Sequence, residues 1–237
     1  MKITCHMISS VDGRLITKYW TPLFDNSSDI TTQYEEVAKK LNADGWIVGR
    51  HTMAEYGEGI EDKEPLQGLR TPQTEPFIGK REGRPIAVVF DTTGRLHYKS
   101  PTLPTGEHIV AVLGSHVTRA YQKELEEVGV SYIVRSPGSH REEATNALKR
   151  IEEVFGVKHL LLEGGGSING SLMQMGLVDA LSVVIYPGVD GKAGRPSIID
   201  CHEEAYERPM EQSKLELTQC EKLSAGFVWL QYNVHKA

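Results

Sequence analysis

Long apolar stretches are missing from this sequence of 237 residues. A membrane-spanning helix needs about 20 predominantly apolar residues in a row, and no run approaches that length. The opening residues, MKITCHMISS, carry one lysine and no extended apolar core, so they do not resemble a signal peptide. We therefore expect a cytoplasmic protein that has no membrane partner, and we expect the opening residues to form a strand.

Cysteine is scarce, and its placement argues against two further classes of protein. Cys5, Cys201 and Cys220 are widely spaced, odd in number and without a C-x-x-C pair. Such a set suits neither a disulfide scaffold nor a structural zinc site. We expect free thiols in a reducing compartment and no bound metal.

Positive charge is also in deficit. The chain carries 26 lysines and arginines against 32 aspartates and glutamates, which gives a net charge of -6. A protein that holds nucleic acid by broad electrostatic attraction needs the opposite balance, so no nucleic-acid partner is expected. A local basic site for a phosphorylated small molecule is compatible with this composition.

What the sequence does contain is an alternation of strands and helices. Apolar runs bounded by turn residues predict strands at 3–8, 45–49, 85–91, 108–114, 130–134, 157–164 and 179–187, and a closing hairpin at 214–223 and 227–234. Capped or helically spaced segments predict helices at 29–42, 50–57, 118–129, 141–156 and 171–176. This order implies a mostly parallel central sheet with helices on both faces and a C-terminal antiparallel hairpin. No linker or repeat divides the chain, so we predict one α/β domain over residues 1–237.

The stretch LLLEGGGSING, residues 160–170, departs from an ordinary strand-to-helix turn. A tight turn needs one or two glycines, whereas Gly164, Gly165 and Gly166 are consecutive and Ser167 follows them. Glycine lets the backbone approach a large anionic group, and a helix N-terminus after a parallel strand binds phosphate. We interpret the run as a cradle for a pyrophosphate. On this interpretation Gly165 or Gly166 matters more for a cofactor than for folding.

The glycine spacing fits none of the common fingerprints. G-x-G-x-x-x-G differs from the Rossmann spacing, no Gly-Lys-Ser/Thr marks a Walker loop, and the second glycine of a nucleophile elbow is missing. A tight turn without a ligand is the alternative for the glycines. A second alternative, Ser167 as a hydrolase nucleophile, needs a histidine and an acid that nothing in the sequence nominates.

A second junction repeats this design. WIVGRHTM ends a predicted strand at Gly49 and places Arg50, His51 and Thr52 at the start of a helix. Arginine offers a planar fork for phosphate, and threonine caps a helix and donates a hydroxyl. A plain capped helix is the alternative. Two such junctions suggest two cradles for one dinucleotide, and Arg50 suits the 2′-phosphate that distinguishes NADPH from NADH.

Four stretches of the sequence resemble known reductases. VGRHTM resembles the cofactor-binding turn of dihydrofolate reductases. LLLEGGGSINGSLMQMGLVDALSVVIYPGVDG is very similar to the signature of the reductase domain of riboflavin-biosynthesis deaminase-reductases, which share that fold. ISSVDGRL and PIAVVFDTTGRL match the same family in the same order. The resemblance covers nearly the whole chain and implies a dihydrofolate reductase-like fold and NADPH as cofactor. With no H-x-E and no P-C-x-x-C pattern, a stand-alone reductase is expected.

The resemblance also implies which residues hold the cofactor. Ile8 and Thr52 are expected along it, and Thr92 near its adenosine half. The residues of the glycine run expected around its phosphates are Gly164, Gly165, Gly166, Ser167, Ile168, Asn169, Gly170 and Ser171.

The substrate half of the site is less completely matched. The resemblance implies that Ser10, Asp12 and Glu163 face the substrate, and Lys40 falls where relatives carry a substrate-phosphate arginine. Asp12 or Glu163 is expected to orient the substrate or steer a proton, and no catalytic residue is assigned. Relatives also carry an Asp-Asp-Pro after the second helix. Here that stretch is MAEYGEGIEDKEPLQGLR, at the start of a long polar loop over residues 58–84 of the kind that is usually functional or mobile.

The expected function is hydride transfer from NADPH to a small polar substrate. The resemblance implies 5-amino-6-(5-phosphoribosylamino)uracil or a related compound. A non-catalytic NADPH-binding or sensing protein, or a reductase of an unrelated C=O or C=N substrate, is the alternative. A homodimer is expected as well, because LSVVIYP and the hairpin residues Phe227, Trp229 and Tyr232 offer more apolar surface than one sheet face buries.

Overall fold

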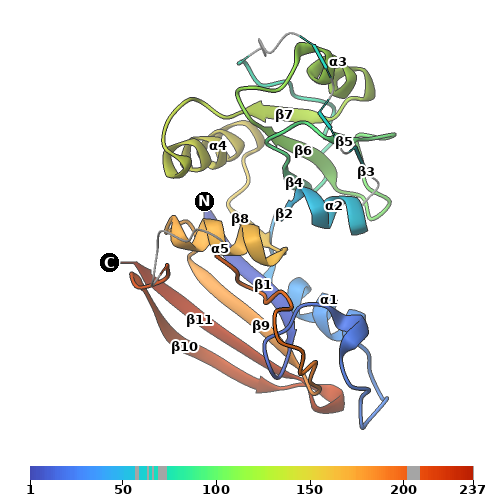
Figure 1. Cartoon of the computed structure of the whole chain (residues 1–237), viewed down its shortest axis with the longest axis vertical. Helices are drawn as coiled ribbons and strands as arrows, with labels where there is room; N and C mark the ends of the chain where they lie inside the picture. The colour runs from blue at the N-terminus through green and yellow to red at the C-terminus, as the bar shows by residue number, and fades with distance from the viewer. Residues whose placement is uncertain (57–58, 63, 66, 69–73, 202–208, 237) are drawn as a thin grey trace. The chain divides into compact units, whose positions relative to one another are not determined.

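A computed structural model describes residues 1–56, 59–62, 64–65, 67–68, 74–201 and 209–236 (Figure 1). The chain divides into two compact units. Unit 1 consists of Met1 and Asp44–Lys158, and unit 2 of Lys2–Ala43 and His159–Ala237. The single domain expected over residues 1–237 stays a prediction. Within the described ranges, no helix has the length and apolar character needed to cross a membrane.

Unit 1 contains a parallel sheet, a small second sheet and three helices. Its elements are β2 (Gly45–Gly49), α2 (Arg50–Tyr56), β3 (Ile60–Glu61), β4 (Ile86–Phe90), β5 (Leu96–His97), β6 (His108–Leu113), α3 (Arg119–Val128), β7 (Ser131–Val134) and α4 (His140–Phe155). The parallel strands lie in the order β2-β4-β6-β7. Strands β3 and β5 pair antiparallel, with Glu61 opposite Leu96. Because β2, β4 and β6 run parallel, the segments that follow them lie at one edge of the sheet.

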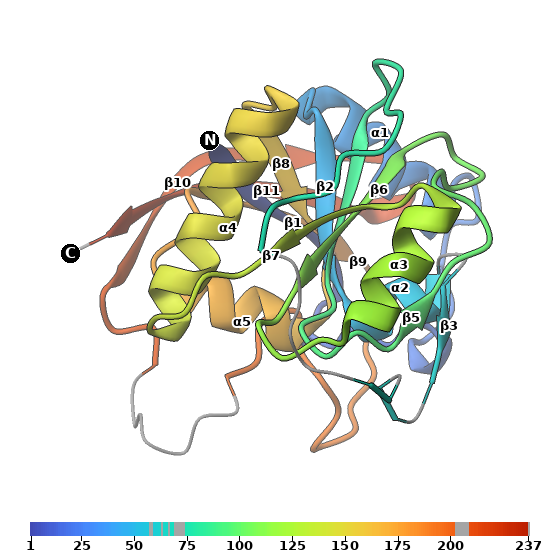
Figure 2. The ribbon, with the colours of Figure 1, turned by 90° about the horizontal axis from the view of Figure 1, so that it is seen from above.

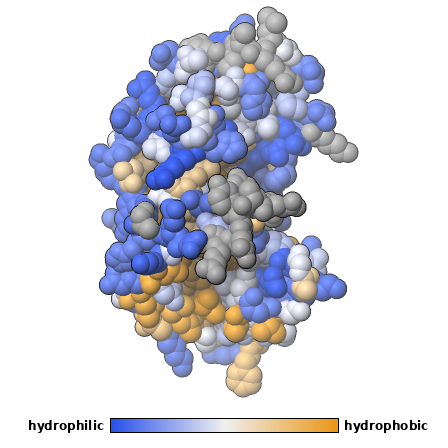
Figure 3. Space-filling model, turned by 60° about the vertical axis from the view of Figure 1, so that its left-hand side comes forward, coloured by the Kyte–Doolittle hydropathy of each residue, from blue (hydrophilic) through white to orange (hydrophobic). Residues whose placement is uncertain are grey.

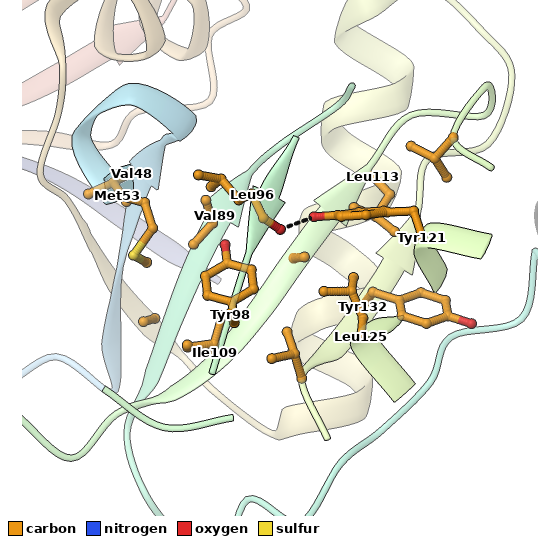
Figure 4. Packing of buried hydrophobic residues seen from close by; sticks show 14 of the residues in the cluster. Val48, Met53, Val89, Leu96, Tyr98, Ile109, Leu113, Tyr121, Leu125 and Tyr132 are labelled. Carbon is orange, nitrogen blue, oxygen red and sulfur yellow. Dashed lines mark hydrogen bonds between the residues drawn. The ribbon is translucent and has the colours of Figure 1, made fainter. Parts of the chain in front are cut away.

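The central strands of unit 1 are apolar throughout because both of their faces are covered. Val89 of β4 points into a cluster with Met53 of α2 and Tyr121 of α3 (Figure 4). Val88 and Val110 belong to the alternate face and are fully buried as well. Figure 2 shows α3 and α4 on opposite sides of the unit 1 strands. This double coverage is why these strands could be recognised from continuous apolar runs.

Helices in unit 1 begin and end at residues with suitable capping chemistry. The Thr118 side chain accepts a hydrogen bond from the backbone N–H of Tyr121, and Gly129 ends α3 with a φ of 90°. Ser139 and Glu142 form a reciprocal capping box at the start of α4. These partners satisfy backbone groups that a helix end otherwise leaves unpaired.

Unit 2 contains five strands and two α-helices. Its elements are β1 (Lys2–Ser10), η1 (Thr17–Tyr19), α1 (Ile30–Leu41), β8 (His159–Leu162), α5 (Gly166–Gln174), β9 (Ala180–Tyr186), β10 (Ser213–Lys222), η2 (Ser224–Gly226) and β11 (Val228–Lys236). The strands lie in the order β10-β11-β9-β1-β8, with β1 parallel to β8 and β9 and the hairpin antiparallel. Asp29 caps α1, and Asn42 ends it with a φ of 48°. Mostly parallel strands and a C-terminal antiparallel hairpin confirm the predicted fold class.

The hairpin aromatics belong to the interior of unit 2. Phe227 is 0% exposed and Trp229 is 4% exposed, and both pack in one cluster with residues of α1 and β9. Tyr232 is half-buried. The expectation that these aromatics leave a large apolar surface is therefore wrong for Phe227 and Trp229, because the sheet and α1 cover them. The exposed apolar residues of the hairpin are Leu215 and Leu217, at 48% and 54%.

The small β3–β5 sheet was not predicted. Each strand has two residues, which is too short for an apolar alternation to be recognised. Strand β3 falls within the loop expected over residues 58–84. Parts of that loop, together with Gly57, the predicted end of the second helix, lie outside the described residues.

Candidate functional site

In unit 2, the carboxyl ends of parallel strands bring two of the predicted substrate residues to one edge. Ser10 is the last residue of β1 and pairs with Tyr186 at the end of β9. Glu163 directly follows β8, whose last residue, Leu162, pairs with Cys5 of β1. In open α/β sheets this edge is where ligands bind.

The strand-to-helix junction after β8 has the chemistry of a phosphate cradle. Gly165 occupies the N-cap position of α5 with φ -67° and ψ -177°, and no side chain caps the helix. A serine or aspartate at this position would bond to the N–H groups of the first turn, which glycine cannot do. Those groups and the helix dipole favour an anion. Gly164 has a φ of 108°, which favours glycine, and the Gly164–Gly165 peptide is cis.

Two other glycines of the run are required by the fold. A Cβ atom on Gly166 would lie 2.4 Å from the carbonyl oxygen of Ser197, and one on Gly170 would lie 2.0 Å from that of Asp200. The backbone N–H of Asp200 donates to the Gly166 carbonyl at 3.0 Å. The segment 197–200 therefore packs directly against α5. The expectation that Gly166 matters more for a cofactor than for folding is wrong, because a side chain there would displace this segment.

The remaining residues of the run divide between interior and surface. Asn169 is fully buried, and its Nδ2 donates to the carbonyl oxygen of Ile198 at 2.8 Å. Ser167 and Ser171 are exposed, and the Ser171 hydroxyl donates to the Ser167 carbonyl at 2.8 Å. Ile168 is half-buried. Asn169 therefore holds the 197–200 segment in place, while the two serines lie on the accessible side of α5.

Asp12 ties two loops of unit 2 together. The Ser10 hydroxyl donates to its Oδ1 at 2.6 Å, and the backbone N–H groups of Asp190 and Gly191 donate to its carboxylate at 3.1 and 2.9 Å. These hydrogen bonds, that from Ser10 first, hold the pKa of Asp12 well below its ordinary value. The carboxylate therefore stays ionised near neutral pH. Asp12 and Glu163 are the two residues predicted to handle a proton, and Asp12 cannot donate one near neutral pH.

Glu163 lies beside Tyr34 of α1. The Tyr34 hydroxyl is within hydrogen-bond reach of the Glu163 carboxylate and also 3.0 Å from the carbonyl oxygen of His6. Burial, and then the charge of Glu163, raise the pKa of Tyr34 well above its ordinary value, so the phenol stays neutral and donates. Burial, and then Glu163, also raise the pKa of the Cys5 thiol to about 12. Glu163 is thus a carboxylate at this edge that has a neutral donor beside it.

His6 stands behind this pair in a buried polar network. The Trp229 indole donates to Ser182 Oγ at 2.8 Å, and Ser182 Oγ lies 3.0 Å from His6 Nδ1. His6 Nε2 lies 3.3 Å from the carbonyl oxygen of Tyr34, which can only accept. His6 Nδ1 also lies 3.3 Å from the carbonyl oxygen of Ser182, so each ring nitrogen faces a carbonyl to which it can donate when it carries the proton. Burial lowers the pKa of His6 to about 4.

Lys40 and Ile8 make contacts within unit 2 that the sequence did not predict. Lys40 Nζ lies 3.2 Å from Glu221 Oε1 and 5.2 Å from the ring centre of Trp229. The charge expected to hold a substrate phosphate is thus paired with a carboxylate of β10. Ile8, expected along the cofactor, is half-buried and packs against the cluster that contains Trp229.

In unit 1, two arginines and a histidine converge on one carboxylate at the start of α2. Arg50 follows Gly49 at the end of β2, and its Nη1 lies 3.0 Å from Glu61 Oε1. His51 Nδ1 lies 3.1 Å from Glu61 Oε2, and Arg95 Nη2 lies 3.5 Å from Glu61 Oε1. The two guanidinium groups and the carboxylate together carry one net positive charge. Guanidinium groups at a strand end suit a phosphate.

Asp91 shapes the loop that carries Thr92 and Arg95. The buried Asp91 carboxylate accepts the backbone N–H of Arg95 at 2.7 Å and that of Gly94 at 3.0 Å. The Thr92 carbonyl accepts the N–H of Gly114, which follows β6, at 3.0 Å. Thr92 and Thr52 are both half-buried. The ends of β2, β4 and β6 therefore bring Thr52, Thr92 and both arginines to the same edge of unit 1.

The three cysteines are free thiols, as expected. Cys5 is buried, Cys201 is half-buried and Cys220 is exposed. Across the described part of the chain, no group of three or more His, Cys, Asp and Glu side chains is arranged to hold a metal ion.

Several site residues were missed by sequence reasoning. Arg95 had a signal, because the Gly-Arg pair after a buried strand repeats the pattern of Gly49 and Arg50. Tyr34 lies on the same helical stripe as Val37, so its inward direction could have been found. Glu61 had no signal, since β3 is too short. The two glycine-bearing junctions lie in different units, so one dinucleotide held by both stays a prediction.

Comparison with known families decides the relationship. The sequence matches the family described as the RibD C-terminal domain over residues 1–229. The chain belongs to this family. The matched range includes both glycine-bearing junctions, the substrate-side residues and all of the small β3–β5 sheet.

Solved structures of related proteins share the fold. A pyrimidine reductase-like protein from Corynebacterium diphtheriae superposes with a TM-score of 0.67 at 18% identity, over 100% of this chain and 92% of that one. RibD from Acinetobacter baumannii superposes with a TM-score of 0.62 at 17% sequence identity, over 98% of this chain and 57% of that one. The riboflavin biosynthesis reductase Rib7 from Saccharomyces cerevisiae superposes with a TM-score of 0.59 at 15% sequence identity, over 98% of this chain and 89% of that one. These likenesses confirm the dihydrofolate reductase-like fold predicted from the sequence.

Proposed function

We propose that this chain is an NADPH-dependent reductase of riboflavin biosynthesis that acts on 5-amino-6-(5-phosphoribosylamino)uracil or a closely related pyrimidine. Membership of the RibD C-terminal domain family over residues 1–229 carries the proposal. The similarity in fold to a riboflavin biosynthesis reductase from yeast, over 98% of this chain, supports it.

Each of the two units offers residues suited to an anionic group of the cofactor. Gly165 at the N-cap of α5 would face the pyrophosphate, because no side chain occupies the first-turn N–H groups. Ser167 and Ser171 lie on the accessible side of the same helix. In unit 1, Arg50 and Arg95 would hold the 2′-phosphate, which favours NADPH over NADH.

The reduction needs a hydride and a proton. NADPH, when bound, supplies the hydride to the acceptor carbon. For a C=N acceptor the carbon gains the hydride and the nitrogen gains a proton, so two electrons pass to the substrate. Glu163 is the candidate for orienting a polar group of the substrate or for passing the proton, with Tyr34 beside it as a neutral donor. Asp12 holds the loop at the substrate side and stays ionised.

A reductase of a different C=O or C=N substrate is a second candidate, and one observation favours it. Lys40, the residue expected to bind a substrate phosphate, is paired with Glu221 at 3.2 Å. A substrate without a phosphate at that point would need no free cation there.

A hydride-transfer assay tests the proposal and separates it from a non-catalytic NADPH sensor. The protein is incubated with NADPH and a panel of pyrimidines and pterins, each with and without its phosphate, and NADPH absorbance is followed. We expect turnover with the phosphoribosylamino-pyrimidine. Turnover only with a substrate lacking the phosphate would favour the second candidate. If the protein binds NADPH but turns over none of the substrates, the result would favour a non-catalytic NADPH sensor.

We also propose a homodimer, in line with the family resemblance. Leu215 and Leu217 of the edge strand β10 are exposed, and they are the apolar contribution that the hairpin offers to a second copy. Figure 3 shows hydrophobic side chains gathered in the lower part of the view. Replacement of both leucines by lysine should yield a monomer in sedimentation at micromolar protein concentration. A wild-type monomer under the same conditions would contradict the proposal.

A further inference from the structure

Glu61 is approached by two guanidinium groups and an imidazole at the strand end where the proposed function places a cofactor phosphate. Arg50, His51 and Arg95 all approach its carboxylate, at 3.0, 3.1 and 3.5 Å. The side chains of Arg50 and Glu61 are each 18% exposed, so this pairing is partly shielded from solvent. Partial shielding strengthens the electrostatic interaction of the group with any anion that binds there.

The position of Glu61 is set by the small sheet of unit 1. Strand β3 pairs with β5, and the N–H of Asp62 donates to the carbonyl oxygen of Arg95 at 3.0 Å. This pairing fixes Glu61 against the first turn of α2.

Arg95 does not depend on Glu61 for its position. Its Nε donates to the carbonyl oxygen of Asp62 at 2.6 Å, and its backbone N–H is held by Asp91 at 2.7 Å. The carboxylate of Glu61 is therefore not required as an anchor for this guanidinium. The effect of Glu61 on Arg95 is therefore mainly its charge, whereas Arg50, 3.0 Å away, is also held in place by it.

The charges at this strand end can be counted. Arg50 and Arg95 contribute two positive charges and Glu61 one negative charge, so the net charge of these three groups is +1. NADPH carries a 2′-phosphate that NADH lacks, and the two cofactors are otherwise alike. A change in this net charge must therefore alter the affinity for NADPH far more than the affinity for NADH.

We propose that Glu61 is a specificity-determining residue that weakens the preference of this chain for the 2′-phosphorylated cofactor, because it neutralises half of the arginine charge at that site. This inference rests on the proposed function. It goes beyond that function by naming a residue that limits the discrimination between NADPH and NADH.

Four proteins test the charge count directly: wild type, Glu61→Gln, Arg95→Gln and the double variant. Their net charges at the site are +1, +2, 0 and +1. Calorimetry with NADPH and with NADH gives the affinity per folded molecule, and thermal melting checks the fold of each. We expect Glu61→Gln to bind NADPH about fivefold or more tightly and Arg95→Gln to bind it about fivefold or more weakly, while NADH changes less than about twofold. The double variant should return close to wild type.

A matched control removes a nearby charge outside the group. Glu55 is exposed on the same helix as Arg50, so Glu55→Gln should leave the ratio of the two affinities unchanged within about twofold. High salt should shrink the difference between wild type and Glu61→Gln.

Four results would overturn the inference. NADPH binding that weakens or stays constant in Glu61→Gln would assign Glu61 an anchoring role or none. An equal change for NADPH and NADH would remove the link to the 2′-phosphate. If Glu61→Gln fails to fold, the Arg95→Gln variant tests the charge count instead. An equal loss of affinity for NADPH and for NADH in that variant would contradict the charge count. Absence of binding of either cofactor to wild type would instead refute the proposed function itself, and the inference with it.

Discussion

The imidazole ring of His6 lies stacked on the phenol ring of Tyr34, with ring centroids 4.3 Å apart and planes at 16°. The two residues also exchange hydrogen bonds, since His6 Nε2 reaches the Tyr34 carbonyl and the Tyr34 hydroxyl reaches the His6 carbonyl. The pair joins α1 to β1 and places the Tyr34 hydroxyl beside Glu163. The candidate carboxylate is therefore supported from behind by a stacked pair of rings, of which His6 is fully buried and Tyr34 half-buried.

The stability of the protein should depend on pH through His6. Its pKa in the folded protein is about 4, below the ordinary value of 6.5, so the unfolded chain binds more protons between those values. The stability contributed by neutral His6 is complete above pH ~6.5 and is lost as the pH falls toward 4. Between pH ~7 and pH ~5, we expect the free energy of unfolding to fall about 2 kcal/mol more in wild type than in His6→Gln. Urea unfolding at both pH values measures this difference. An equal change in the free energy of unfolding with pH in wild type and in His6→Gln would show that His6 titrates normally.

Removal of the Tyr34 hydroxyl should affect activity more than stability. Tyr34→Phe keeps the stacked ring and loses one hydrogen bond, which costs about 1 kcal/mol of stability. If the hydroxyl orients Glu163, kcat/KM should fall about tenfold, and a Glu163→Gln background should show little further loss. An equal effect of Tyr34→Phe in both backgrounds would mean that the two residues act independently.

The glycines of the junction should separate into two groups. Gly166→Ala meets the Ser197 carbonyl at 2.4 Å and should destabilise the protein by about 2 kcal/mol or more. As a control, Gly191 has a φ of 72° with nothing within 4 Å, so alanine there should cost about 1 kcal/mol from conformation alone. Gly165 has backbone angles that alanine adopts, so Gly165→Ala should fold normally. Its affinity for NADPH should fall at least about tenfold. If Gly165→Ala binds NADPH with normal affinity, the three glycines serve only as a tight turn and not as a pyrophosphate site.

Lys40 should contribute little to substrate binding. Its ion pair with Glu221 is exposed, at 50% and 39%, and such pairs stabilise a protein by less than about 1 kcal/mol. Lys40→Gln should therefore leave the melting temperature nearly unchanged and alter KM for a phosphorylated substrate less than about twofold. A rise in KM of about tenfold, confined to phosphorylated substrates, would restore the role that the resemblance implied.

Elements with strong local signals could be predicted from the sequence. Helix α1 begins after an aspartate cap at Asp29 and ends at Asn42, and the sequence predicts both bounds. The hairpin around Ser224–Gly226 was also predicted with its two strands. Strand β4 was found because double burial leaves a continuous apolar run. Each of these signals lies within a few residues of the element that it specifies.

The details of the site depend on contacts between distant residues, which no local pattern contains. Asp12 is an anchor because loop residues 190 and 191 approach it, 178 and 179 positions away. Gly166 is constrained by the segment that includes Ser197, and Lys40 by Glu221. A residue type suited to binding a ligand is equally suited to these internal roles. The sequence therefore pointed to the sheet edges at which ligand binding is proposed, but it could not assign each residue to ligand binding or to the fold.

Isotope transfer is the most direct measurement of the proposed reaction. The protein is incubated with NADPH deuterated at both C4 positions of the nicotinamide and with 5-amino-6-(5-phosphoribosylamino)uracil, and the product is analysed by mass spectrometry. We predict a product with one carbon-bound deuterium, formed by wild type and much more slowly by Gly165→Ala. No labelled product with wild-type protein, despite saturating NADPH, would contradict the assignment of this chain as an NADPH-dependent reductase of that pyrimidine.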